Sequence, residues 1–264
     1  MTGILDKKTV ANVVSSAVRG LPRIKGLGIL IRLIGDRFQN QPIVLEKKVL
    51  GSRLRLRTDD LLGRALIFAP NYWDRRERKI IERIVKAGDY VVDIGANIGW
   101  YTLFLAKLVG PKGRVDSIEA EQANADELRH NVQINSARQV TIHQVGVSDK
   151  KETLGLMLNT TGNAGGHSFY DQSHIADPVV QKISCVPLST ITAKRRPKFM
   201  KLDIEGFEYR VLRKFFEDRP KKDWPEYLMV EDNPERREDD AIQLCVEKGY
   251  RVLERFTPNV FLRI

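Results

Sequence analysis

Hydrophobic residues recur with different spacings in the N-terminal third and in the rest of the chain. Residues 1–40 are expected to be helical, with a break at Gly26–Gly28. Short apolar bursts over residues 42–69 predict a small antiparallel meander, whose last member contains Leu66-Ile67-Phe68. Asp74–Lys86 carries its isoleucines on one helical face, which predicts an amphipathic helix.

Apolar runs and helical patterns then alternate with a regular spacing. The predicted strands are Tyr90–Ile94, Arg114–Ile118, Val140–Val145, Phe199–Asp203 and Glu226–Glu231, and the predicted helices are Ile98–Val109, Asn124–Ile134, Tyr209–Phe216 and Asp239–Lys248. Such alternation is typical of a parallel sheet with helices on both faces. Tyr250–Phe256 and Val260–Arg263, joined by a turn at Thr257-Pro258-Asn259, predict a closing hairpin.

One stretch interrupts this alternation. Leu154–Leu158 and Ile183–Val186 are predicted to be additional strands. Asn159–Ser173, between them, is rich in Gly, Asn, Thr and His. A loop of this length is more typical of a functional lid than of a simple connection.

The charge of the chain is unevenly distributed. The net charge is +10. Residues 1–89 hold 19 Lys and Arg against 9 Asp and Glu, whereas residues 90–264 are neutral with 25 of each kind. We therefore divide the chain into a basic N-terminal extension, residues 1–89, and a second domain, residues 90–264. A basic block fits contact with nucleic acid, a membrane surface or an acidic substrate, and it equally fits a solvated surface.

The chain shows no sign of export or of a membrane span. Its two cysteines, Cys185 and Cys245, lack the spacing of metal ligands and are expected to be buried thiols of a reducing compartment. Met1–Val18 lacks the apolar core of a signal peptide. Leu21–Leu33 is too short and too charged to span a bilayer, and it fits either an interfacial helix or a helix packed on the domain. A cytoplasmic location is expected, with possible peripheral contact of residues 1–40 with a membrane.

The turn after the first strand of the second domain carries the main chemical signal. It reads Asp93-Ile94-Gly95-Ala96-Asn97-Ile98-Gly99. Glycines at such a turn let the backbone approach a nucleotide-type cofactor closely. The acid at Asp93 would repel a pyrophosphate but suits a ligand with a positive amine. The spacing Gly-x-Asn-x-Gly also differs from the Gly-x-Gly-x-x-Gly of dinucleotide-binding folds.

The next two strands end in residues suited to the rest of an adenosyl group. Glu119 ends the second strand, where a carboxylate can accept hydrogen bonds from both ribose hydroxyls. The third strand ends at Gly146-Val147-Ser148-Asp149, where adenine contacts are expected. Together with the acid at Asp93, these positions favour S-adenosylmethionine over a nicotinamide cofactor.

Three segments carry a resemblance to a known family. Residues Asp93–Thr102, Glu119 with Asn131, and Lys201-Leu202-Asp203-Ile204-Glu205-Gly206-Phe207-Glu208 resemble the FkbM family of S-adenosylmethionine-dependent methyltransferases. The similarity covers roughly residues 50–262, and the segment Asp203–Glu208 is its most specific part. The resemblance implies a class I, Rossmann-like sheet of about seven strands with the last strand antiparallel. It also implies O-methylation, commonly of sugar or polyketide hydroxyls.

The resemblance can be carried to individual positions. Cofactor contacts are expected from Asp93, Gly95, Ala96, Asn97, Gly99, Tyr101, Thr102, Glu119, Ala120, Val147, Ser148 and Asp203. Ala120 stands where the family usually has Pro. Tyr72-Trp73-Asp74 stands where it often has Tyr-Glu, which puts the substrate side in doubt. Trp100 or Tyr101 would shield the sulfonium, or else belong to the core as Phe104 is expected to do.

Methyl transfer to a hydroxyl calls for alignment and for a general base. The candidate bases are Asp203, Glu205 and His167. Glu208 is expected to hold the turn into the next helix. Glu231-Asp232-Asn233-Pro234 fits either the wall of the acceptor pocket or a helix-capping turn. No metal is expected, because Asp203 and Glu205 would point in alternate directions along an extended segment.

Two other functions remain as alternatives. One is an RNA or other nucleic-acid methyltransferase that uses the basic extension, although the sequence lacks an Asn-Pro-Pro-Tyr-type tetrapeptide after the fourth strand. The other is a nicotinamide-dependent oxidoreductase. The expected partner is a hydroxyl-bearing acceptor, possibly an anionic glycan or glycolipid, and nucleic acid is not expected.

Overall fold

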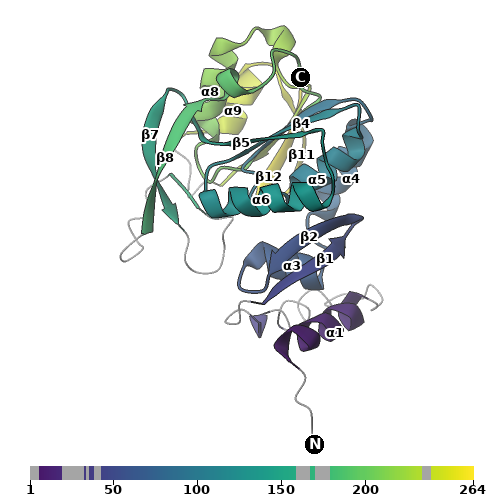
Figure 1. Ribbon diagram of the computed structural model, residues 1–264. Coiled ribbons are helices and arrows are strands. Elements are labelled where there is room, and N and C mark those ends of the chain that lie inside the picture. Colours follow the sequence, from purple (N-terminus) through teal and green to yellow (C-terminus); the bar gives the residue numbers. More distant parts are fainter. Residues whose placement is uncertain are drawn as a thin grey trace, which may run out of the picture.

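A seven-stranded sheet forms the centre of the molecule (Figure 1). The computed structural model describes residues 6–19, 33, 36–38, 43–158, 167–169, 179–233 and 239–264. In spatial order the strands are β11 (Arg251–Arg255), β12 (Asn259–Arg263), β10 (Tyr227–Glu231), β9 (Phe199–Leu202), β3 (Tyr90–Ile94), β4 (Arg114–Glu119) and β5 (Val140–Gln144). β12 pairs antiparallel with both of its neighbours, β11 and β10, and the other strand pairs of this sheet are parallel. The predicted parallel sheet, with its antiparallel closing hairpin, is therefore confirmed.

Helices cover both faces of the sheet because each strand alternates between two apolar layers. Val91 faces one layer, while Val92 and Ile94 face the other. The helices of the domain are α4 (Arg75–Ile84), α5 (Trp100–Val109), α6 (Gln122–Ile134), the short α7 (Leu188–Ile191), α8 (Glu208–Asp218), the 3₁₀ turn η2 (Lys221–Asp223) and α9 (Ala241–Glu247). Helices α4 and α5 contribute to the first layer, whereas α8 and α9 contribute to the second.

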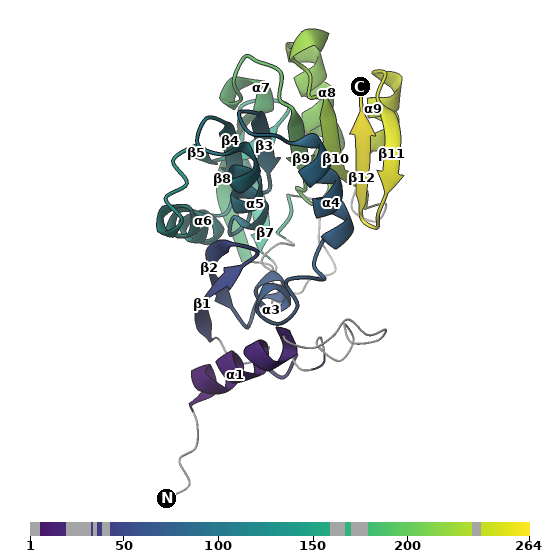
Figure 2. The same cartoon turned by 90° about the vertical axis from the view of Figure 1, so that its right-hand side faces the viewer.

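The N-terminal part stacks beneath the sheet, as Figures 1 and 2 both show. It contains α1 (Lys7–Arg19), the hairpin of β1 (Val44–Val49) and β2 (Ser52–Arg57), and α3 (Leu61–Phe68). The predicted third strand of the meander is wrong, because Leu66-Ile67-Phe68 belongs to α3. Asp60 begins this helix by accepting a hydrogen bond from the backbone N–H of Gly63 at 2.7 Å. A short apolar run by itself does not distinguish a buried helix from a strand.

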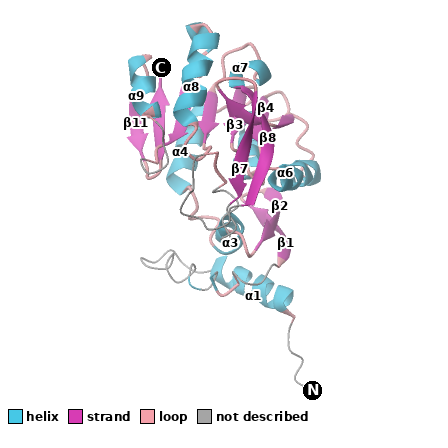
Figure 3. Cartoon of the chain, turned by 90° about the vertical axis from the view of Figure 1, so that its left-hand side faces the viewer, coloured by secondary structure: helices cyan, strands magenta, loops and turns pink. Residues whose placement is uncertain are grey.

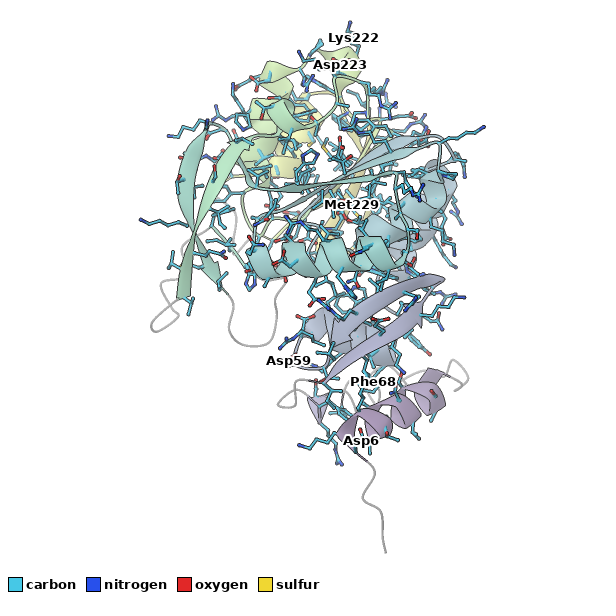
Figure 4. All side chains as sticks on the ribbon, viewed as in Figure 1. Asp6, Asp59, Phe68, Lys222, Asp223 and Met229 are labelled. Carbon is cyan, nitrogen blue, oxygen red and sulfur yellow. The ribbon has the colours of Figure 1, made fainter. Side chains whose placement is uncertain are left out.

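The hairpin shares its core with the large sheet. Leu45, Leu54 and Leu66 belong to the same buried cluster as Val91 and Leu105. Phe68 in the N-terminal layer and Met229 in the sheet, both labelled in Figure 4, belong to this cluster as well. Residues on both sides of position 89 therefore pack into one core. The division of the chain into two domains at this position stays a prediction.

Several basic residues of the hairpin have acidic partners. Arg53 pairs with Glu46, Arg57 pairs with Asp59, and Arg55 makes two hydrogen bonds to Glu127 of α6. Glu46 and Asp59 belong to the extension and are already counted in its net charge, so of these contacts the pair with Glu127 is the one that offsets part of the excess positive charge.

A small three-stranded sheet lies beside the large one. It consists of β6 (Gly146–Ser148), β8 (Val179–Pro187) and β7 (Glu152–Leu158), and Figure 3 shows β7 and β8 side by side. The two additional strands predicted here are thus confirmed. Of the predicted lid Asn159–Ser173, the structure describes residues 167–169 alone.

No helix within the described ranges is long and apolar enough to cross a membrane. Leu21–Leu33 lies outside the described residues except at its last position. Cys185 and Cys245 are both buried free thiols, as expected.

Asn131 joins the hairpin, α6 and the start of α5, so its removal should destabilise the fold. Its side chain donates to the backbone oxygen of Ile98 at 2.8 Å and accepts from the N–H of Arg55 at 2.7 Å. Asn131→Ala leaves both backbone groups without these partners and should cost about 3 kcal/mol of unfolding free energy, measured by urea denaturation. Asn135→Ala is the matched control.

Asn135 bonds to both backbone groups of Arg53, but in an exposed position. Its loss should cost under about 1 kcal/mol, since water replaces the bonds. Equal losses for the two variants would contradict the bridging role of Asn131.

Candidate active site

A cavity of about 520 Å³ opens at the carboxyl ends of the parallel strands. It extends across the edge of the sheet from residues that follow β5 to residues that follow β10. Its lining includes Leu61, Leu62, Trp73, Asp74, Gly95, Ala96, Asn97, Trp100, Tyr101, Glu119, Ala120, Val145, Val147, His167, Lys201, Asp203, Glu205 and Glu231. The strand order reverses between β3 and β9, and this is where doubly wound sheets bind their ligands.

The glycine-rich loop at the centre of this cavity needs glycine at two positions. Gly95 has a φ of 76°, and a Cβ there would lie 1.8 Å from the carbonyl oxygen of Asp203. Gly99 has a φ of 93°, and a Cβ there would meet the side chain of Leu128 at 2.6 Å. Asn97 is also left-handed, with a φ of 50°. Its Oδ1 accepts from the N–H of Ile98 at 2.7 Å, a local bond that supports this conformation.

Glu119 fastens the loop to the end of β4. Its two carboxylate oxygens accept hydrogen bonds from the N–H of Asn97 at 2.7 Å and from that of Glu121 at 2.9 Å. Burial raises the pKa of this carboxyl to about 7, and the charges of Glu121 and Asp93 act in the same direction. Each oxygen keeps a lone pair that can face the cavity, which fits the predicted acceptor of ribose hydroxyls.

Asp93 supports the loop from below. It is fully buried and lies in register with Lys201 on β9 and Ser117 on β4. One carboxylate oxygen accepts from the hydroxyl of Thr102 at 2.7 Å, while Oδ1 has no hydrogen-bond partner among the described residues. Burial raises the pKa of Asp93, and the Lys201 ammonium opposes this effect. Neither Asp93 nor Thr102 is among the described residues that line the cavity.

Lys201 connects this buried acid to the cavity. Its Nζ lies 2.9 Å from Asp203 and 4.0 Å from Asp93, and it stands 5.2 Å from the centre of the Tyr101 ring. Burial by itself lowers the pKa of Lys201, but the carboxylates of Asp203 and Asp93 raise it above its ordinary value. The lysine therefore remains charged although only 3% of its side chain is exposed.

Asp203, Glu205 and Glu231 meet on the far side of Lys201. One carboxylate oxygen from each lies within 4.8 Å of the others. The expectation that Asp203 and Glu205 point in alternate directions is wrong, because Glu205 has a φ of 54° and the segment is not extended. Glu208 holds this turn, as predicted, by accepting hydrogen bonds from the N–H groups of Ile204 and Gly206.

Asp74 occupies the same end of the cavity in a left-handed conformation, with a φ of 46°. It stands at the N-cap position of α4, yet the described first turn of that helix receives no capping bond from its side chain. Burial and the nearby charge of Glu77 raise the pKa of Asp74 to about 6. The hydroxyl of Tyr101 and the ammonium of Lys201 act in the opposite direction.

His167 and the residues predicted for the adenine end complete the set of candidates. Burial lowers the pKa of His167, and the charges that oppose this belong to Glu121 and Asp60. Ala120 and Val147 line the cavity as predicted, whereas Ser148 is buried and bonded to Glu152.

Sequence reasoning gave Lys201 no role at the site. It compared Tyr72-Trp73-Asp74 with the Tyr-Glu of the family on the substrate side, but it did not name Asp74 as a candidate base. A cation beside Asp203 in a buried strand is a signal that could have identified Lys201, since a buried Lys requires a partner. Trp100 and Tyr101 both line the cavity, and Phe104 belongs to the core as expected.

The sequence profile described as the methyltransferase FkbM domain matches residues 93–252, more than half of the chain. The chain belongs to the FkbM methyltransferase family. It is therefore a methyltransferase, and its methyl donor is S-adenosylmethionine. This result rules out the nicotinamide-dependent oxidoreductase. No curated protein sequence matches the chain.

Several solved structures are similar to the chain at low identity. The methyltransferase FkbM from Methylobacillus flagellatus KT is 18% identical with a TM-score of 0.44, over 90% of this chain and 60% of its own. A SAM-dependent methyltransferase from Aquifex aeolicus is 18% identical with a TM-score of 0.41, over 73% and 92%. TYW2 from M. jannaschii, in complex with AdoMet, is 16% identical with a TM-score of 0.44, over 85% and 89%.

Donor binding should depend on pH through Glu119. With a pKa of about 7, this carboxyl is half protonated in the empty protein at neutral pH. A protonated carboxyl offers fewer acceptor positions to the ribose, so affinity for S-adenosylhomocysteine should rise about tenfold from pH 6 to pH 8. Isothermal titration at both pH values measures this change.

The variant Glu119→Gln supplies the control, because it has no titrating group at this position. Its weaker affinity should show a smaller change over the same interval. A wild-type affinity that is flat between pH 6 and pH 8 would sink the assignment of Glu119 to the ribose.

Proposed function

We propose that this methyltransferase transfers the methyl group to a hydroxyl of a sugar, a glycan or glycolipid, or a secondary metabolite. The observation that carries the proposal is the position of four carboxyl groups at one end of the cavity. Asp74, Asp203, Glu205 and Glu231 come from three separate parts of the chain and line the wall beside Lys201. Carboxylates at this position can accept a proton from a hydroxyl as it attacks.

The reaction needs little more than alignment and proton removal. The hydroxyl oxygen attacks the methyl carbon, an O–C bond forms, and the C–S bond of the sulfonium breaks. The electron pair of that bond remains on sulfur, and the hydroxyl proton passes to a carboxylate. The donor is activated before it binds, so the protein contributes position and a base.

Asp74 is better suited to the role of base than the residues that the sequence suggested. Asp203 forms an ion pair with Lys201 at 2.9 Å, which occupies one of its carboxylate oxygens. Asp74 has a pKa of about 6, which is close to the value that favours proton transfer near neutral pH.

The charge of the cavity also bears on the acceptor. S-adenosylmethionine carries one net positive charge and fits an acidic cavity. A phosphate or carboxylate beside the reacting hydroxyl would be repelled by the same four acids. We therefore infer a neutral reacting position, and any anionic part of a glycan or glycolipid would lie outside the cavity. The same repulsion disfavours a nucleic-acid acceptor.

Contact of residues 1–40 with an anionic glycan or membrane remains a proposal. The described part of that segment is mainly α1, which buries Ala11 and Ser15 against the fold and exposes Lys7, Lys8 and Val13. The cytoplasmic location likewise remains a prediction.

An acceptor panel tests the proposed function. Methyl-labelled donor should be incorporated into neutral sugars or polyols faster than into matched uronic acids or RNA, because the acids at the cavity end repel anions. The measurement is counting of labelled product with confirmation of the methyl ether by mass spectrometry. Transfer to RNA, with none to any hydroxyl compound, would overturn the proposal.

Asp74→Asn tests the base. The variant should lower kcat for the best hydroxyl acceptor by about 10²- to 10⁴-fold, since the amide cannot take the proton. Affinity for S-adenosylhomocysteine should remain within about threefold, as isothermal titration would show. Asp89→Asn, a charge-matched change far from the cavity, serves as the control. An unchanged kcat in Asp74→Asn would contradict the role.

A further inference from the structure

Three carboxyl groups converge at the acceptor end of the cavity. Asp203 follows β9, Glu205 lies in the next turn, and Glu231 ends β10. One oxygen of each lies within 4.8 Å of the other two. Opposite ligands of an octahedral ion are separated by twice the metal–oxygen distance, about 4.2 Å for Mg²⁺ and somewhat more for larger ions. The spacing therefore fits a shared cation.

The backbone around these groups is held in place by several contacts. Lys201 fixes Asp203 at 2.9 Å. Glu208 accepts hydrogen bonds from the N–H groups on either side of Glu205. The hydroxyl of Ser168, a buried residue of the loop after β7, donates to the carbonyl oxygen of Glu205 at 2.6 Å. The convergence is thus built by neighbouring segments, not by the three acids alone.

Glu231 supplies an independent sign that something is bound there. Only 9% of this residue is exposed, and its side chain lines the cavity. Its Oε2 is buried without a hydrogen-bond partner among the described residues. A buried carboxylate oxygen without a partner is costly, and a cation would satisfy it.

We propose that Asp203, Glu205 and Glu231 bind a divalent cation that prefers oxygen ligands, such as Mg²⁺ or Mn²⁺. Three carboxylates with no sulfur or imidazole ligand favour hard ions of this kind. The expectation of a metal-free site rested on an extended segment, and the left-handed turn at Glu205 removes that premise.

The cation would also restrict the class of acceptor molecules, and this second inference rests on the proposed function. Three protein ligands leave coordination positions open toward the cavity. A hydroxyl bound there becomes more acidic. Two neighbouring hydroxyls could occupy two such positions, which favours vicinal diols among the neutral acceptors.

Titration with Mn²⁺ tests the site without any donor or acceptor. Electron paramagnetic resonance should show one saturable Mn²⁺ per full-length chain, displaced by excess Mg²⁺. Glu205→Gln and Asp203→Asn should each weaken Mn²⁺ binding more than tenfold. Asp74→Asn removes one charge from the same cavity but none of the three ligands. The affinity of this variant for Mn²⁺ should therefore fall less than threefold. Circular dichroism confirms that each variant is folded.

Several results would overturn the proposal. One is the absence of saturable Mn²⁺ binding, and another is an equal weakening of Mn²⁺ binding by Asp74→Asn and Glu205→Gln. A third is complete loss of Mn²⁺ on saturation with S-adenosylhomocysteine, because the ammonium of that ligand would then be the natural occupant of the site. Because the titration needs no methyl transfer, its result is independent of the acceptor panel. Retention of one Mn²⁺ in the presence of S-adenosylhomocysteine would support the site.

Discussion

The ion pairs of Lys201 are the contacts on which the rest of the site depends. The parallel register of β3 and β9 brings Asp93 beside Lys201, and the next residues of the chain bring Asp203 to the other side of the ammonium. Each of these charges would be costly to bury alone, and together they compensate one another. The arrangement anchors the floor of the cavity to the sheet.

Several residues at the strand ends have backbone conformations that the close packing around Asp203 and the cavity requires. The loop after β3 passes so close to Asp203 that Gly95 has no room for a Cβ. The turn after β9 and the start of α4 bring Glu205 and Asp74 into the cavity in left-handed conformations. Non-glycine residues in this region carry strain, which is found most often at functional sites. The left-handed conformations direct these two carboxyl groups into the cavity. An extended or helical backbone would direct them elsewhere.

Family membership and geometry answer different questions about this enzyme. The FkbM profile establishes methyl transfer, but loops around a shared fold determine the acceptor. The acidic end of the cavity is formed by Asp74, Asp203, Glu205 and Glu231. It provides the physical basis for expecting a neutral hydroxyl, and the convergence of three of these acids provides the basis for a cation.

The sequence by itself determined the alternation of strands and helices, the antiparallel closing hairpin and the positions of Asp93 and Glu119 at strand ends. These features depend on local periodicity and on the order of elements along the chain. The helix at Leu66-Ile67-Phe68 was missed because a short apolar run carries no periodicity that separates a helix from a strand. The tertiary structure alone decided that Asp74 belongs to the site, that Lys201 joins Asp93 to Asp203, and that Glu205 turns toward Glu231. Those relations depend on strand register and on left-handed residues, and neither can be read from the spacing of residues along the chain.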